Sequence, residues 1–364
     1  MDADSLAGLR AQFMARGWHR KATARIVTEL LVHLAIALGG IAAFIFLHGT
    51  AVRVVAMLVA TSGTLGVATN THTSSHYATS NRRWVNEVLT YFGYPFFLGL
   101  SATAWRNSHI VMHHPAPNVI GQDGDIKFQP FAATDWEVSG ASGALATYYR
   151  MQWLLFPLVV WVHVFLRQSN GVKYLAGVLR DPARRRAAHW WDAAALGAHI
   201  IAWYIIPAWF FPVWHVIGFN LLRIWALSYP LFCVVAPGHM PKEAAVVALR
   251  DRAKDFVLLQ TATTANFRTG LYGRFLCSGL DCQIEHHLFP DYSHVYYPAM
   301  SPLVAEFCAR QGYPYHSLGW AEAVWKTFAI FYTPKRVQNN LESLRVRPRA
   351  VVADRGVARD ADVL

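Results

Sequence analysis

Charge is scarce in this sequence. Only 15% of the 364 residues are Asp, Glu, Lys or Arg, whereas a soluble domain usually carries about a quarter. Hydrophobic residues make up 54% of the chain. This balance argues against a soluble domain and predicts an all-α integral membrane protein. The net charge of +11 lies in loops between apolar runs, which is typical of a cytoplasmic membrane face and does not favour nucleic acid as the partner.

Cysteine is also sparse, and the four that occur do not form a recognisable site. Cys277 and Cys282 are five residues apart, which matches no common zinc or redox spacing, and Cys233 and Cys308 stand alone. We interpret all four as small, reduced, apolar residues. The chain has no G-x-G-x-x-G or P-loop motif and no internal repeat, so nothing predicts a nucleotide-binding fold.

Four long apolar runs are present, and each has the roughly 20 residues that a membrane-spanning helix needs. They cover residues 26–48, 51–70, 190–211 and 213–235. The first is too long for a cleaved signal peptide and is expected to be retained. We therefore expect a cytosolic N-terminal segment at 1–25, one membrane domain with a cytosolic cap at 26–343, and a disordered polar tail at 344–364.

Two further apolar stretches, 85–104 and 147–166, are ambiguous. If the basic loops all face the cytoplasm, the four long runs cross in two pairs, and these stretches must enter and leave on one side. Gly93, Pro95 and Gly99 interrupt the first stretch. Pro157 and a cluster of aromatic residues suit the second to the interface. The sequence therefore predicts about four transmembrane helices, together with interfacial or re-entrant helices.

Histidines gather at the ends of these runs. The chain has 17 histidines, and eight of them form three clusters and one isolated site. The clusters are H-T-S-S-H (His72, His76), H-I-V-M-H-H (His109, His113, His114) and Q-I-E-H-H-L-F-P (His286, His287), and His239 follows the last run. In the four-span topology all four groups reach the same membrane face.

Their spacing predicts metal binding. Residues four apart share a helix face, so His72 with His76, and His109 with His113, are each expected to bind one metal. Adjacent histidines point about 100° apart on a helix, so the doubled pairs indicate two metal ions. Eight histidines exceed the four ligands of one zinc. Imidazole suits iron, copper and zinc alike, and spacing does not choose among them.

The clusters resemble the three histidine boxes of the membrane-bound fatty acid desaturase/hydroxylase superfamily. The third box, with Gln283 where many members have histidine, resembles the front-end and acyl-lipid desaturase branch. So do P-N-V-I-G-Q-D-G-D-I at 117–126 and N-F at 266–267. The resemblance covers about residues 60–300, and the boxes are specific as a set rather than singly.

The resemblance implies a non-haem di-iron centre, with two Fe ions and O2 as co-substrate, held by a cytosolic helical cap. The ligands it implies are His72, His76, His109, His113, His114, His239, His286 and His287, with Gln283 as a ninth candidate. Asn107, Asp123, Asp125 and Glu285 are candidates for orienting the imidazoles. Substrate-binding residues are not predicted.

The implied function is desaturation of the acyl chain of a lipid or acyl-CoA in the plasma or inner membrane if the chain is bacterial. No cytochrome b5 motif H-P-G-G is present, so a separate ferredoxin or cytochrome b5 is the expected electron donor. Box one lacks the aspartate that often follows its first histidine. A hydroxylase or ketolase on the same centre is the first alternative, because both reactions begin with the same hydrogen abstraction. A non-enzymatic metal-binding protein is the second.

Overall fold

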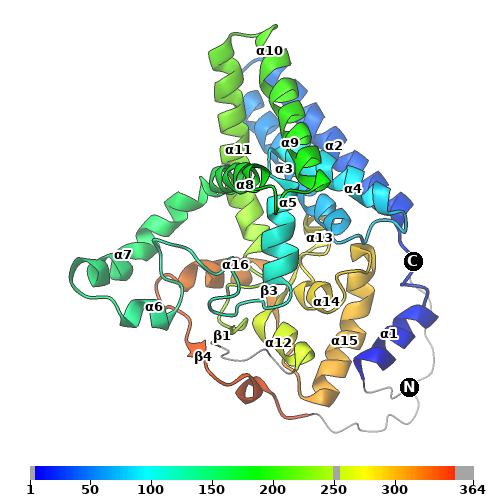
Figure 1. The fold of residues 1–364 in the computed structure, drawn as a ribbon, viewed down its shortest axis with the longest axis vertical. Coiled ribbons are helices and arrows are strands. Elements are labelled where there is room, and N and C mark those ends of the chain that lie inside the picture. Colours follow the sequence, from blue (N-terminus) through cyan, green and yellow to red (C-terminus); the bar gives the residue numbers. More distant parts are fainter. Residues whose placement is uncertain (1–4, 249–254, 349–364) are drawn as a thin grey trace.

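The computed structural model describes residues 5–248 and 255–348, and it places a bundle of long helices above a wider helical cap (Figure 1). The first two long helices, α2 (Thr23–Phe46) and α3 (Thr50–Ser75), form a tight hairpin. A Cβ atom on Gly63 would lie 2.2 Å from the backbone nitrogen of Ala37. Such close backbone contact through small residues is typical of helix pairs in membranes.

The second hairpin contains the other two predicted spans. Residues 190–211 lie in α9 (Ala187–Ile200), η3 (Ile201–Ile205) and α10 (Ile206–Ala208), which follow one another directly. They run beside α11 (Val213–Val235) to the tip of the bundle (Figure 1). Of the described helices, α2, α3 and α11 are each long and apolar enough to cross a membrane. The helical class and the membrane character are confirmed, and the topology with four spans stays a prediction.

Both ambiguous stretches are interrupted helices. Residues 85–104 form α4 (Arg83–Tyr91), the π-helix η1 (Phe92–Leu98) and α5 (Ala102–Trp105). Residues 147–166 lie in α7 (Gly143–Val160) and α8 (His163–Arg180), which are bent by 77° at their junction. Only when taken together are these two helices long and apolar enough to cross a membrane, as a broken span or a re-entrant loop. The bend agrees with an interfacial placement but leaves it a prediction.

Arg223 is fully buried inside the spanning helix α11. Its guanidinium donates to the carbonyl of Phe97, over a distance of 3.3 Å, and lies 3.9 Å from the ring centre of Trp203. Phe97 belongs to η1, so the cation meets the carbonyl end of that interrupted helix, where the helix dipole is negative. The contact joins the apolar helix α11 to the C-terminal end of η1.

The cap consists of short helices and two small parallel sheets. Its helices are α1 (Leu6–Ala15), η2 (Arg106–His113), α6 (Asp135–Ser139), α12 (Phe256–Thr263), α13 (Leu271–Cys277), α14 (Gln283–Leu288), η4 (His294–Tyr296), α15 (Tyr297–Gln311), α16 (Trp320–Ala329) and η5 (Leu341–Leu344). Strand β1 (Val246–Val247) pairs with β4 (Val337–Gln338), and β2 (Asn266–Arg268) pairs with β3 (Ser317–Gly319).

Both ends of the described chain pack on this cap. The ring of Phe13 in α1 meets that of Phe289 edge to face, at a centroid distance of 5.1 Å. Near the other end, the amide of Val346 donates to the carbonyl of Gly312, over 3.0 Å. Residues 344–348 of the predicted disordered tail therefore contact the cap, and the remaining residues, 349–364, lie outside the described part of the chain.

Candidate metal centre

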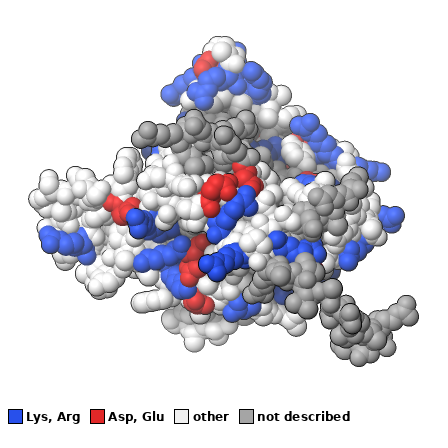
Figure 2. All heavy atoms as spheres, turned by 90° about the horizontal axis from the view of Figure 1, so that it is seen from below, with Lys and Arg blue, Asp and Glu red and all other residues white. Residues whose placement is uncertain are grey.

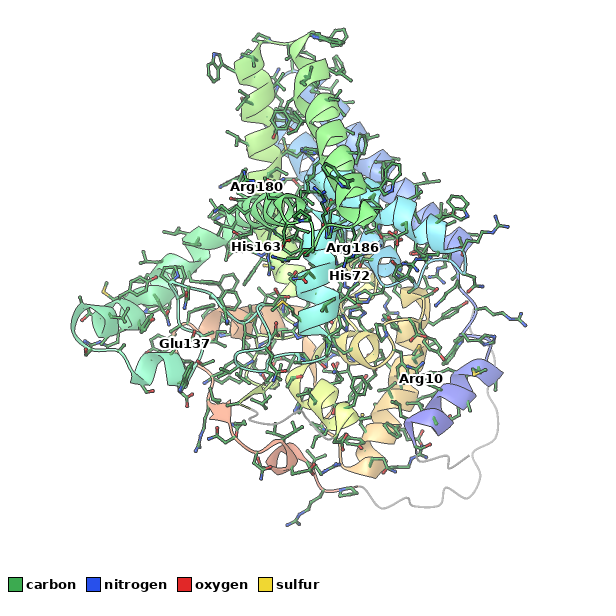
Figure 3. All side chains as sticks on the ribbon, viewed as in Figure 1. Arg10, His72, Glu137, His163, Arg180 and Arg186 are labelled. Atoms are coloured by element: carbon green, nitrogen blue, oxygen red, sulfur yellow. The ribbon has the colours of Figure 1, made fainter. Side chains whose placement is uncertain are left out.

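The predicted ligand histidines meet where the bundle joins the cap. His72 lies in the last turn of α3 and His76 ends that helix. Figure 3 shows His72 near the centre of the molecule, at the foot of the bundle. Helix η2 supplies the second cluster, and α14 in the cap supplies the third. With His239, which follows α11, four separate segments of the chain therefore converge.

A first group of histidines contains members of all three clusters. One ring nitrogen from each of His72, His76, His109 and His286 lies within 4.8 Å of every other in the group. Ligands of one ion at about 2.1 Å are separated by at most roughly 4 Å, so this spacing is close to that of a bound metal. The Nε2 atoms of His72 and His109 are 2.8 Å apart. Their lone pairs converge on a common point.

A second group forms beside the first. His113, His239 and His287 bring ring nitrogens within 4.8 Å of one another, and His114 does so with His286 and His287. The adjacent pair His286 and His287 therefore faces two different groups, as its spacing predicts. The arrangement provides donors for two metal ions, with His114 between them.

The second cluster lies on a different kind of helix from the one expected. The prediction assumed an α-helix that would place His109 and His113 on one face. Instead η2 is a π-helix, in which the amide of His114 donates to the carbonyl of His109, over 2.9 Å. The wider turn brings the Nε2 atoms of His109 and His114 to 3.2 Å. His109 also comes close to His113, in a third grouping that includes Asp125.

The donor atoms fit a bound metal. Among the described residues, several buried ligand atoms of the two groups have no hydrogen-bond partner. They are Nε2 of His76, His286 and His287, and Nδ1 of His114 and His239. Buried polar atoms are nearly always paired, so these unpaired nitrogens in the two histidine groups fit the ligands of a bound cation. Burial, together with nearby positive groups, lowers the pKa of His76 to about 3, so its ring is neutral and its lone pair is free at pH 7.

Gln260 in α12 determines the proton position on His287. Its Nε2 donates to the carbonyl of His114, over 3.0 Å, and a carbonyl only accepts. The amide oxygen must therefore face His287, where it lies 2.8 Å from Nδ1. His287 must donate from Nδ1, which leaves the Nε2 lone pair directed at the metal group. Sequence reasoning missed this residue, although a glutamine within the apolar stretch F-V-L-L-Q-T-A was a visible signal.

Two of the predicted orienting residues contact the site. Asp123 is fully buried and its Oδ2 lies 2.8 Å from Nδ1 of His113. Burial lowers the pKa of His113, but the hydrogen bond to Asp123 outweighs it and the net shift is upward. Asp125 lies 4.0 Å from the same nitrogen and 2.9 Å from Arg167. Sequence reasoning also missed Asn118, whose backbone amide donates to Asp123 and whose side chain donates to the carbonyl of His239.

The other predicted residues have different neighbours. Glu285 accepts from Asn266, over 2.7 Å, and from Tyr315, over 2.8 Å, so it holds α14 rather than an imidazole. The amide of Asn107 donates to Met112 Sδ, and in the described structure it bonds no histidine. The Oε1 atom of Gln283 is buried and lacks a partner within the described chain. Its amide could therefore serve a metal or a water molecule.

The histidine groups can be compared with known proteins. A family model described as fatty acid desaturase matches residues 49–319, which is most of the chain. The chain belongs to the fatty acid desaturase family. This match confirms the resemblance that the histidine boxes indicate.

Characterised members of the desaturase family share moderate identity with this chain. The Delta(5) fatty acid desaturase fat-4 of Caenorhabditis elegans is 32% identical over 256 residues, which is 67% of this chain and 55% of that protein. The Delta(8)-fatty-acid desaturase 2 of Arabidopsis thaliana is 26% identical over 334 residues, covering 87% and 72%. Fatty acid desaturase 3 of Homo sapiens is 26% identical over 251 residues, covering 67% and 53%. The match thus spans about half the length of two of these three relatives.

Proposed function

We propose that this chain is a membrane-bound, O2-dependent di-iron fatty acyl desaturase. The observation that carries the proposal is the divergence of His286 and His287 into two histidine groups at the foot of a membrane bundle. Two adjacent donor sets rich in nitrogen suit a pair of iron ions, and the desaturase family supports iron over zinc or copper.

The proposed ligands divide between the two groups. His72, His76, His109 and His286 would hold one ion, and His113, His239 and His287 the other, with His114 at either and Gln283 as a further candidate. When bound, the di-iron centre supplies the activation of dioxygen that hydrogen removal from an unreactive methylene requires. The overall change is R-CH2-CH2-R′ + O2 + 2e⁻ + 2H⁺ → R-CH=CH-R′ + 2H2O.

The side chains around the ligands prepare the site for this reaction. Gln260 holds the proton of His287 on Nδ1, and Asp123 accepts from Nδ1 of His113, so each ring presents Nε2. Six of the eight proposed histidine ligands are buried, which limits the access of bulk water and protects a reactive centre from side reactions. The acyl chain must enter from the bilayer, because the site lies at the foot of the apolar bundle (Figure 1).

We further propose that an acidic one-electron carrier, of the ferredoxin or cytochrome b5 type, docks on the cap. Lysine and arginine groups spread over the cap face in Figure 2, around a smaller acidic cluster. A hollow of about 520 Å³ opens among Lys242, Lys335 and Arg336. Its Lys335 donates to the carbonyl of His239, over 2.9 Å, so the hollow adjoins the second group. Basic loops also favour a cytosolic position for this face.

Lipid analysis tests the function. The chain would be expressed in a host of known lipid composition, and its fatty acids would be profiled by mass spectrometry. We expect a product two mass units lighter than its saturated precursor and about two irons per chain. A product that retains an oxygen atom would instead establish the hydroxylase or ketolase alternative. About one zinc and no iron per chain would refute the di-iron proposal and favour a metal-binding protein.

Charge reversal tests the docking surface. In Lys242→Glu and Arg336→Glu variants, we expect a higher KM for an acidic donor protein and an unchanged KM for the acyl substrate, because both side chains are exposed at the hollow. Salt should raise the KM of the parent chain in the same way. Equal donor KM values in the parent and the variants would place docking elsewhere.

A further inference from the structure

His294 lies outside the three histidine boxes, yet it contacts the interior of the site. It belongs to η4, after the third box, and only 6% of its surface is exposed. Its Nδ1 lies 2.7 Å from the hydroxyl of Thr73, which follows His72 in α3. Its Nε2 lies 3.1 Å from Oε2 of Glu29 in α2. The imidazole therefore bridges two polar groups through its two nitrogens.

The inner end of this bridge opens on a small cavity beside the first histidine group. The cavity has a volume of about 10 Å³ and is lined by His72, Thr73, His76, His286 and His294, among others. That volume is about the minimum that holds one water molecule. The Thr73 hydroxyl and the proposed metal ligands thus share one water-sized space.

The outer end of the bridge reaches the surface. The side chain of Glu29 is 21% exposed, and its Oε1 accepts from Nε of Arg25, over 3.0 Å. Arg25 is 68% exposed and lies near the start of α2, at the cap end of the bundle. A continuous line of exchangeable groups therefore joins solvent to the cavity.

The proposed reaction needs a path that carries protons from solvent to the metal centre. Its two water molecules contain four hydrogens, of which two leave the acyl chain and two must come from solvent. Six of the eight proposed histidine ligands are buried, and His76 and His239 are partly buried. We propose that Glu29, His294 and Thr73 form a proton relay that supplies the buried metal centre from the cytosolic face. The proposal rests on the proposed function, although a hydroxylase on the same centre would also consume two protons.

Each transfer occurs between atoms already in contact. Glu29 takes a proton from solvent and passes it from Oε2 to Nε2 of His294. The ring releases its other proton from Nδ1 to Oγ1 of Thr73, and the Thr73 hydroxyl donates its own proton to the water in the cavity. The ring ends this transfer neutral, with its proton on Nε2, so no net charge stays on the relay, and exchange of its ring protons with water restores the Nδ1–H tautomer before the next transfer. Imidazole suits this role because its two nitrogens exchange donor and acceptor roles.

A second series of charged residues does not lead to the cavity. Arg167 and Asp125 form contacts from the surface inward, but these contacts end at Nδ1 of His113. That nitrogen belongs to a proposed ligand and is already bonded to Asp123. The line through His294 instead ends in the cavity.

The relay and a purely structural bridge predict different behaviour. His294→Gln keeps an amide that can bond both neighbours but cannot pass a proton, and Thr73→Val removes only the hydroxyl. Thr73→Ser retains the relay, and His48→Gln is a control at an exposed histidine between α2 and α3. All variants would be loaded with iron and reduced, and the rate of dioxygen uptake would be measured in H2O and D2O, with and without imidazole.

We expect His294→Gln and Thr73→Val to lower the rate about 10- to 100-fold and to raise the solvent isotope effect, at unchanged iron content and unchanged KM for the acyl substrate. The Thr73→Ser and His48→Gln variants should stay within about twofold of the parent. Imidazole should restore part of the rate in His294→Ala, whose side chain leaves space for it.

Parent-like rates and isotope effects in His294→Gln and Thr73→Val would overturn the relay. So would a loss of rate that follows loss of iron and that imidazole does not restore, because the bridge would then be structural. Failure of the proposed function shows separately, in the parent protein, as dioxygen uptake without a double-bond product.

Discussion

Replacing Gln260 with Leu should weaken the second metal group without disturbing the first. The change removes the acceptor for Nδ1 of His287 and the donor to the carbonyl of His114, and it leaves both buried. Loss of such an orienting partner typically lowers metal affinity 10- to 100-fold, which corresponds to about 1.4–2.7 kcal/mol. The ring of His287 would then be free to turn or to change tautomer.

The assay is competition for iron against a chelator of known affinity, read as iron per chain. We expect Gln260→Leu to lose about one iron per chain at chelator concentrations that leave the parent fully loaded. Gln260→Glu, protonated in its buried position, can still accept from His287 and donate to His114 and should lose less. Thr261→Val is the matched control, because that hydroxyl bonds only within its own helix. Equal iron retention by Gln260→Leu and the parent would refute the assigned tautomer.

Three further predictions concern other parts of the molecule. His286→Ala and His287→Ala should each abolish product formation and reduce iron by about one per chain, measured by elemental analysis, whereas full activity in either would contradict the two-group assignment. Gly63→Ala should lower the thermal unfolding midpoint in detergent, because its Cβ would meet the backbone of α2, whereas Gly39→Ala faces open space and should not. Arg223→Leu should destabilise the fold by about 1–2 kcal/mol at normal iron content, and an unchanged midpoint would show that the contact with η1 is dispensable.

The sequence predicted which histidines converge, because histidine spacing is a local property, and metal binding by these groups stays a prediction. His72 with His76, and the diverging pair His286 and His287, follow from residues per turn alone, and the structure brings these groups together as expected. The apolar runs predicted the bundle for the same reason.

Residues that orient the ligands were harder to predict. Gln260 and Asn118 act through contacts with residues distant in the chain, and no local spacing indicates such contacts. The π-helix of η2 was missed because its wider turn depends on packing rather than on sequence period. Glu285 was assigned to an imidazole from its position in the box, whereas its contacts with Asn266 and Tyr315 arise only when the cap folds.

The wide separation of the histidine clusters along the chain sets the order in which the centre is assembled during synthesis. Five of the proposed ligands, from His72 to His114, leave the ribosome early and enter the membrane region with their partners still missing. Neither group is complete until α14 has been made and Glu285 has anchored it to the cap. The proposed metal sites therefore have their full set of ligands only after residue 287 has been synthesised, and a chain that ends before residue 286 would carry an incomplete set.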